Sequence, residues 1–234
     1  NRAQVAIAEG RFDKSLVPIF HDDGRLALDH EEFPRPGTTV DDLGKLAPSF
    51  AGMGAHVLQD RGMSIDEIAR KAYPHIEGID HVHHAGNSSG VVDGAGAVLV
   101  ASPDYAKAHG MTPRARIVMT AVAGTEPVIM LTAPGPATHM VLKKAGMTID
   151  DIDLFEVNEA FAAVVLKWLR DTGADWGKTN VNGGAMALGH PIGATGSMLI
   201  GTVLDELERR DLTTGLVTMC TGGGMGTATI IERI

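Results

Sequence analysis

The single cysteine of the chain, Cys220, stands at the end of an apolar stretch, shortly before the glycines of residues 222–224. Backbone N–H groups in such a run can approach a ligand closely and hold a developing negative charge on oxygen. A thiol beside them can exchange a proton with a substrate carbon if the local field lowers its pKa. The alternative is a buried, unreactive cysteine that only packs at a strand end.

A second glycine-rich stretch, residues 182–196, has five glycines in fifteen residues and the step His190-Pro191 in its middle. Its spacing matches neither the P-loop nor the dinucleotide-binding fingerprint. Because a proline disfavours helical backbone in the residue before it, His190 is expected on extended chain just before a helix. A histidine held among glycines in this way favours a functional role over a structural one.

Two further segments carry polar side chains after turns or strands. Asn158 follows an apolar strand, so it either caps the next helix or holds a water or a carbonyl with its amide. Residues 87–95 are either a simple turn or part of a ligand site. Three histidines, His81, His83 and His84, have the side chains of a metal site. No carboxylate or cysteine stands at ligand spacing beside them, which disfavours metal binding.

The elements that must position these residues alternate between strand and helix. From residue 115 onward, period-two and period-3.6 apolar patterns predict an α/β domain with a mostly buried, layered sheet. Strands are predicted at 115–123, 152–157, 179–181, 216–220 and 227–231, and helices at 135–145, 159–171 and 194–210. The apolar run 95–101 predicts one more buried strand. Because sites gather at strand ends in such folds, the motif residues are expected to lie close together.

Residues 1–86 are irregular by comparison. Short strands are predicted at 16–20 and 25–29, around an Asp-Asp-Gly turn. A capping box at Ser64 and Glu67 predicts a helix to about residue 72. The chain opens inside a predicted helix that Gly10 ends, which indicates a piece of a longer protein.

The composition excludes several classes of protein. The chain has 234 residues, of which 44% are hydrophobic and 29 are glycine, and this is enough apolar material for a substantial core. The net charge is −9 and there is no basic run, so we expect no nucleic-acid partner. No apolar stretch is long enough for a membrane span. A single cysteine fits a reducing compartment, and we expect a cytoplasmic protein.

Taken together, the motifs resemble the thiolase family. The segments AGNSSGVVDGAGAVLV, NEAFA, NVNGGAMALGHPIGATGS and CTGGGMGTATIIERI follow the order and spacing of that family. The resemblance is highly specific from about residue 84 to the last residue. It is looser over residues 1–83, where NRAQVAIAEGRF and KLAPSF carry it.

The resemblance implies a role for each catalytic residue. His190 would activate a nucleophilic cysteine that takes the acyl group from coenzyme A, and Asn158 would position a water in the same oxyanion hole. Cys220 would be the second cysteine, which protonates or deprotonates the α-carbon of acetyl-CoA. The N–H of Gly222 would help to bind the oxygen of the tetrahedral intermediate.

The resemblance also implies where the substrate binds and how the chain is organised. Ser89 would contact the pantetheine of coenzyme A, while Ala160 and Phe161 would line the acyl pocket. Coenzyme A is then a substrate and no cofactor is needed. The implied fold is the layered αβαβα thiolase fold, usually a homodimer or homotetramer. Its divisions here are residues 1–86 in the loop domain, 87–112 closing the amino-terminal domain, and 113–234 as the carboxy-terminal βαβαβαββ domain.

Two departures from the family pattern matter. The nucleophilic cysteine is absent, so the chain resembles a carboxy-terminal half that is expected to be inactive without an amino-terminal half. Residues 51–86 are longer than the corresponding segment of short-chain biosynthetic thiolases, and we expect them to adapt the enzyme to a bulkier acyl chain. These features favour a degradative thiolase of lipid or fatty-acid β-oxidation.

Two alternatives remain beside this interpretation. Ketoacyl synthases share the fold, but they typically carry a second histidine where Cys220 stands. A non-catalytic thiolase relative that binds coenzyme A or lipid is the other alternative. The intact set of Asn158, His190 and Cys220 disfavours it.

Overall fold

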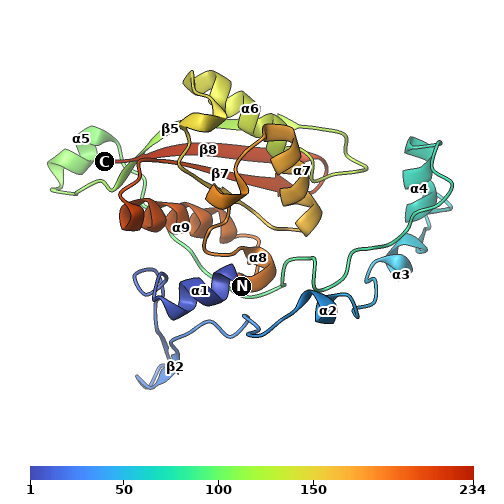
Figure 1. Ribbon diagram of the computed structural model, residues 1–234, viewed down its shortest axis with the longest axis horizontal. Coiled ribbons are helices and arrows are strands. Elements are labelled where there is room, and N and C mark those ends of the chain that lie inside the picture. Colours follow the sequence, from blue (N-terminus) through green and yellow to red (C-terminus); the bar gives the residue numbers. More distant parts are fainter.

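A computed structural model describes all residues, 1–234. Its centre is a four-stranded mixed sheet with the strand order β5-β8-β7-β6. Strand β8 pairs antiparallel with both β5 and β7, whereas β6 and β7 are parallel. Figure 1 shows α6 and α7 on one face of this sheet and α9 on the other. The strands are β5 (Ala115–Gly124), β6 (Leu154–Val157), β7 (Thr214–Thr221) and β8 (Met225–Arg233), and the covering helices are α6 (Pro134–Ala145), α7 (Ala162–Thr172) and α9 (Thr195–Arg210).

The core has two parts, one on each face of the sheet. In β6, Phe155 faces the cluster under α6 and α7, and Leu154 faces the cluster under α9, since successive side chains of a strand point to opposite faces. Trp168 of α7 is fully buried beside Phe155 and donates a hydrogen bond from Nε1 to Thr138 Oγ1 at 2.9 Å. This sandwich confirms the predicted layered α/β domain.

The remaining elements precede the sheet or connect its strands. Helix α4 begins with the predicted capping box of Ser64 and Glu67, and the predicted hairpin around the Asp-Asp-Gly turn is present. The remaining elements are α1 (Arg2–Ala8), β1 (Ile19–Phe20), β2 (Leu26–Leu28), α2 (Val40–Leu43), α3 (Ala51–Gly54), β3 (Val57–Leu58), β4 (Met63–Ser64), α4 (Ile65–Ala72), α5 (Pro103–Ala108), α8 (Ala185–Leu188) and the short 3-10 helices η1 (Ile149–Asp151) and η2 (Trp176–Lys178).

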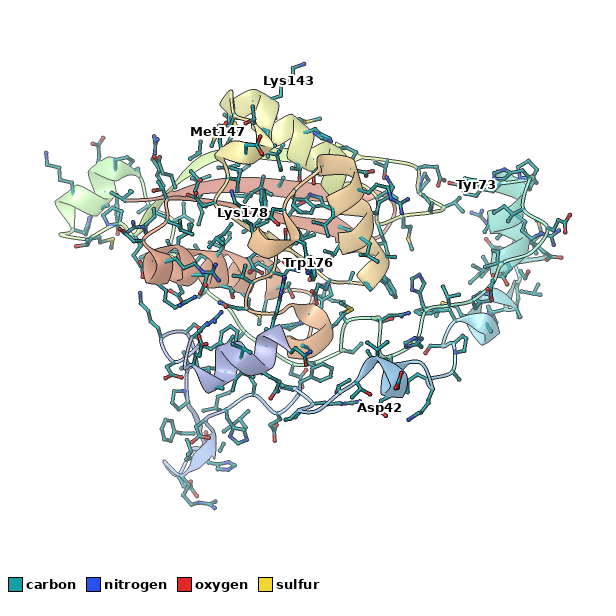
Figure 2. All side chains as sticks on the ribbon, in the orientation of Figure 1. Asp42, Tyr73, Lys143, Met147, Trp176 and Lys178 are labelled. Carbon is teal, nitrogen blue, oxygen red and sulfur yellow. The ribbon has the colours of Figure 1, made fainter.

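Between α1 and α5 the chain forms an open arm along one side of the sheet domain (Figure 1). Gly54 is the only buried residue between positions 11 and 105. Helix α1, in contrast, is docked. Arg2 Nη1 donates to Thr179 O at 2.5 Å, and the Arg2 guanidinium lies 4.1 Å from the ring centroid of Trp176, which Figure 2 labels. The arm therefore starts from a fixed point on the sheet domain.

The predicted buried strand at residues 95–101 is wrong. These residues form neither helix nor strand, and Leu99 is 80% exposed. A strand needs a neighbour to pair its N–H and C=O groups, and no segment of the chain lies beside this one as a strand. The apolar pattern is present, but its partner is not.

Two smaller predictions also needed correction. Helix α7 begins at Ala162 with Phe161 as its N-cap, so Asn158 is not a helix cap. Instead, the Asn158 N–H donates to Thr218 O at 3.0 Å and continues the pairing between β6 and β7. The predicted strand at 179–181 is reduced to isolated bridges at Thr179 and Val181. No helix has both the length and the apolar character needed to cross a membrane.

Candidate functional site

Asn158 and His190 form a hydrogen-bonded pair at the carboxyl end of β6. The Asn158 Nδ2 atom lies 3.2 Å from His190 Nε2. On the other side of the ring, His190 Nδ1 lies 2.7 Å from Thr195 Oγ1. Asn158 is 1% exposed, and its Oδ1 is buried without a hydrogen-bond partner. The Asn158 amide oxygen therefore lacks a donor within the chain, while its amide nitrogen bonds the imidazole.

The hydrogen bonds determine which nitrogen of His190 carries the proton. The Thr195 hydroxyl donates its one hydrogen to Pro191 O at 2.9 Å, so Oγ1 must accept from His190 Nδ1. Nε2 is then unprotonated and accepts from the Asn158 amide. Burial lowers the pKa of His190 below its ordinary value, which keeps the ring neutral near pH 7. A neutral imidazole with an unprotonated Nε2 can act as a base.

Residues 87–90 join the motif segments. Ser89 N–H donates to Ala160 O at 3.0 Å, and His190 N–H donates to Gly90 O at 2.9 Å. Ser88 forms an isolated antiparallel bridge with Phe161. The backbone bonds of residues 88–90 thus bring together four of the predicted site residues: Ser89 lies beside Ala160 and Phe161, and His190 is bonded to Gly90, which follows Ser89.

Cys220 lies at the carboxyl end of β7, next to β6 in the sheet. It is 7% exposed and pairs with Gly226 of β8. The prediction that the local field lowers its pKa is wrong for this chain, because burial raises the pKa of the thiol to about 11. Cys220 is therefore a protonated thiol at neutral pH.

Gly222 lies in the turn between β7 and β8. A Cβ added to it would meet nothing within 4 Å, and its N–H makes no backbone hydrogen bond. The turn is held from behind, since Thr125 N–H donates to Gly224 O at 2.6 Å and a Cβ on Gly224 would come equally close to Thr125 O. An open N–H on a supported turn is a suitable donor to an oxyanion.

Glu159 is a buried residue beside the site to which the sequence motifs assign no role. Its carboxylate is buried, and it accepts from Asn180 Nδ2 at 3.1 Å and from the Met186 N–H at 3.0 Å. Burial raises the pKa of Glu159, and these two hydrogen bonds oppose the rise. Glu159 ties the start of α8 to the chain beside Asn158, so it positions the stretch that leads to His190. The sequence feature that could have identified Glu159 is its position as an acidic residue just after a buried strand.

Gly184 leaves the space that the Glu159 carboxylate occupies. A Cβ on Gly184 would lie 2.4 Å from Glu159 Oε2. We expect Gly184→Ala to lower the free energy of unfolding of the complete protein by about 1–3 kcal/mol, the usual cost of overpacking a filled interior. Chemical denaturation measures this.

Gly193→Ala is the matched control, because a Cβ on Gly193 in the same stretch meets nothing within 4 Å. Adding Glu159→Ala to Gly184→Ala should relieve the collision, so the two losses should not add. Equal destabilisation by the two glycine replacements would contradict this account.

The three histidines at positions 81, 83 and 84 do not form a metal site. His81 Nε2 lies 2.9 Å from Asp66 Oδ2, and His84 Nδ1 accepts from the Gly86 N–H at 3.0 Å. His83 faces Phe161 with ring centroids 4.8 Å apart. No three His, Cys, Asp or Glu side chains of the chain are arranged so that they could hold one metal ion. A cavity of about 280 Å³ beside Lys143 and Met147 (Figure 2) is lined by none of the motif residues.

Comparison with known proteins gives a consistent result. A family model described as "Thiolase, C-terminal domain" matches residues 111–233. The whole chain is 42% identical to 53% of the acetyl-CoA acetyltransferase of Thiocystis violacea. It is also 44% identical to 55% of the 3-ketoacyl-CoA thiolase of Aeromonas hydrophila subsp. hydrophila.

Solved structures agree with the sequence relatives. Human mitochondrial 3-ketoacyl-CoA thiolase in complex with CoA superposes with a TM-score of 0.82 and 40% identity, over the whole of this chain and 52% of the human chain. The acetyl-CoA acetyltransferase of Bacillus anthracis gives a TM-score of 0.80 at 35% identity, over 53% of its chain. The chain therefore spans about half the length of the relatives it matches.

Proposed function

Since the chain belongs to the thiolase family, we propose that it supplies the proton-transfer and oxyanion-binding half of an enzyme that cleaves or forms the carbon–carbon bond of a 3-oxoacyl-CoA. The observation that supports this most directly is the hydrogen-bonded pair of Asn158 and His190 at the carboxyl end of β6. Cys220 lies near the carboxyl end of the neighbouring parallel strand β7. Family membership alone would not require these side chains to converge.

In the cleavage direction, each of these residues has one task. His190 Nε2 takes the proton of a nucleophilic cysteine, whose thiolate attacks the 3-oxo carbon of the substrate. The bond between C2 and C3 then breaks, and its electron pair passes to the enolate of acetyl-CoA. Cys220 gives its proton to C2 of that enolate. The thiol of coenzyme A then takes the acyl group from the nucleophilic cysteine, and its proton restores Cys220. Cys220 is protonated at neutral pH, as this step requires, and in the reverse direction its thiolate would take the proton from C2.

The oxygens that develop charge need donors. A water held by Asn158 and the imidazole of His190 would serve the thioester oxygen, and the Gly222 N–H would serve the tetrahedral intermediate. Ser89 would contact the pantetheine, with Ala160 and Phe161 against the acyl group. Coenzyme A is a substrate in this scheme, and acyl and proton transfer call for no redox group.

An amino-terminal half with the nucleophilic cysteine completes the enzyme in this proposal. The exposed apolar residues 95–101 support it, because they have the pattern of a buried strand and no partner within the chain. We divide the chain into residues 1–86 of the loop domain, 87–112 closing the amino-terminal domain, and 113–234 as the carboxy-terminal domain. We infer a cytoplasmic homodimer or homotetramer that acts in β-oxidation.

The test is thiolysis of a series of 3-oxoacyl-CoAs by the complete protein. We expect CoA-dependent cleavage, no turnover by residues 1–234 alone, and a preference for acyl groups longer than acetoacetyl. A protein that binds CoA but cleaves no member of the series would support the non-catalytic alternative. Restriction to acetoacetyl-CoA would remove the assigned role of residues 51–86.

A further inference from the structure

His83 has a ring nitrogen without a partner. Its Nδ1 is buried, and it makes no hydrogen bond with any group of the chain. An unpaired polar atom in a buried place costs free energy unless a ligand or a water completes its hydrogen bonding. The neighbouring His81 and His84 both have ring nitrogens in hydrogen bonds, so His83 is the exception in this group.

The backbone holds His83 in a defined position. Asn87 bridges the turn, because its Oδ1 accepts from the His84 N–H at 2.9 Å and its Nδ2 donates to Val82 O at 3.0 Å. The Ser49 N–H donates to His83 O at 2.8 Å, so an earlier part of the arm lies beside His83. These bonds fix the backbone that carries the His83 ring, and the two phenylalanine rings pack against the ring itself.

Two aromatic rings stand beside His83. Its ring centroid is 4.8 Å from that of Phe161 and 6.4 Å from that of Phe50, and the two phenylalanine rings are 5.8 Å apart. Phe161 follows Ala160, whose carbonyl accepts from the Ser89 N–H. Phe50, His83 and Phe161 thus form a wall, which we call the aromatic wall, next to the residues assigned to the acyl group and the pantetheine.

We propose that His83 selects the acyl group, by a hydrogen bond from Nδ1 to an oxygen carried on the acyl chain beyond the 3-oxo carbon. This rests on the proposed function, because it takes Phe161 as a wall of the acyl site. The aromatic wall contacts the apolar body of the acyl group. A hydroxyl or carbonyl oxygen on that body satisfies Nδ1, which either donates or accepts according to its tautomer. A plain hydrocarbon chain leaves Nδ1 unpaired.

The test compares pairs of 3-oxoacyl-CoAs of equal length, one with a plain chain and one with a hydroxyl or oxo group further along it. The readout is the ratio of kcat/KM for the oxygenated and the plain member, measured on the complete protein. We expect a ratio above one for the unaltered protein. His83→Phe, which keeps an aromatic ring and removes Nδ1, should lower the ratio about tenfold.

Two further variants make the result specific. His83→Asn places an amide nitrogen near the position of Nδ1 and should restore part of the ratio. His21→Phe is the matched control, because His21 is exposed on the β1–β2 hairpin, and it should leave the ratio unchanged. Circular dichroism and thermal melting show whether each variant is folded.

The outcomes separate this proposal from the one on which it rests. No cleavage of any 3-oxoacyl-CoA by the unaltered protein would overturn the proposed function itself. Cleavage with no preference for the oxygenated member, or a His83→Phe loss that is equal for all substrates, would overturn the role of His83. An equal loss with a raised KM for CoA would assign Nδ1 to a pantetheine amide instead.

Discussion

Cys220→Ala in the complete protein should leave acyl-enzyme formation in place and slow carbon–carbon bond formation by about 10²–10⁴-fold, the usual contribution of a positioned acid or base. In the proposed mechanism acylation relies on His190, whereas bond formation relies on Cys220 to take the proton from C2 of acetyl-CoA, the reverse of its proton donation during cleavage. Trapping of labelled acyl-enzyme measures the first step. Synthesis of acetoacetyl-CoA from acetyl-CoA measures the second.

Two controls accompany this variant. Met219→Leu alters the half-buried neighbour of Cys220 and keeps the thiol, so both steps should survive. Cys220→Ser keeps the shape of the side chain but raises the pKa of its proton further, so bond formation should remain slow. Unchanged synthesis by Cys220→Ala would remove this residue from the mechanism.

His190→Ala should slow acyl-enzyme formation by about 10²–10⁴-fold, since in the proposed mechanism it removes the base that takes the thiol proton. Burial lowers the pKa of His190 below its ordinary value, so the ring stays neutral as the pH falls past 6.5. The acid limb of the acylation rate should therefore lie below pH 6.5. Rapid-quench measurement of acylation between pH 5 and 8 provides both results.

Thr195→Val tests whether the orientation and tautomer of the His190 ring matter, in addition to the presence of the ring. The imidazole remains, but Nδ1 loses the hydroxyl that now accepts its proton at 2.7 Å, and the tautomer with the proton on Nε2 becomes available. Acylation should fall to a level between those of the unaltered protein and His190→Ala. An acylation rate that His190→Ala leaves unchanged would refute the role of this histidine.

The strand and helix order of the sheet domain could be predicted because each of its elements carries a local pattern. Helix α9 and strands β7 and β8 bury one or both faces, and their apolar periodicity reflects this directly. Strand β6 is short, but all four of its residues are buried, which makes it apolar enough to recognise even with Glu156 inside it. Local propensity and tertiary packing agree in this part of the chain.

Prediction failed where a residue depends on a partner distant in sequence. Residues 95–101 have the pattern of a strand, but a strand also requires a ladder partner, and none lies alongside. Asn158 has the side chain of a helix cap, yet pairing with β7 draws it into the sheet and moves the start of α7 to Ala162. Helix-capping preferences depend only on residues close in sequence to the helix start, so they do not take a neighbouring strand into account.

The sequence by itself determined the chemical groups that are present, their order along the chain and the family resemblance, because these depend only on residue types and spacing. The tertiary structure alone decided how those groups are tuned. It set the tautomer of His190 through Thr195, raised the pKa of Cys220 by burial, placed Glu159 between Asn180 and Met186, and left His83 Nδ1 unpaired beside Phe161. Hydrogen bonding and desolvation act through space, so residue order does not specify them.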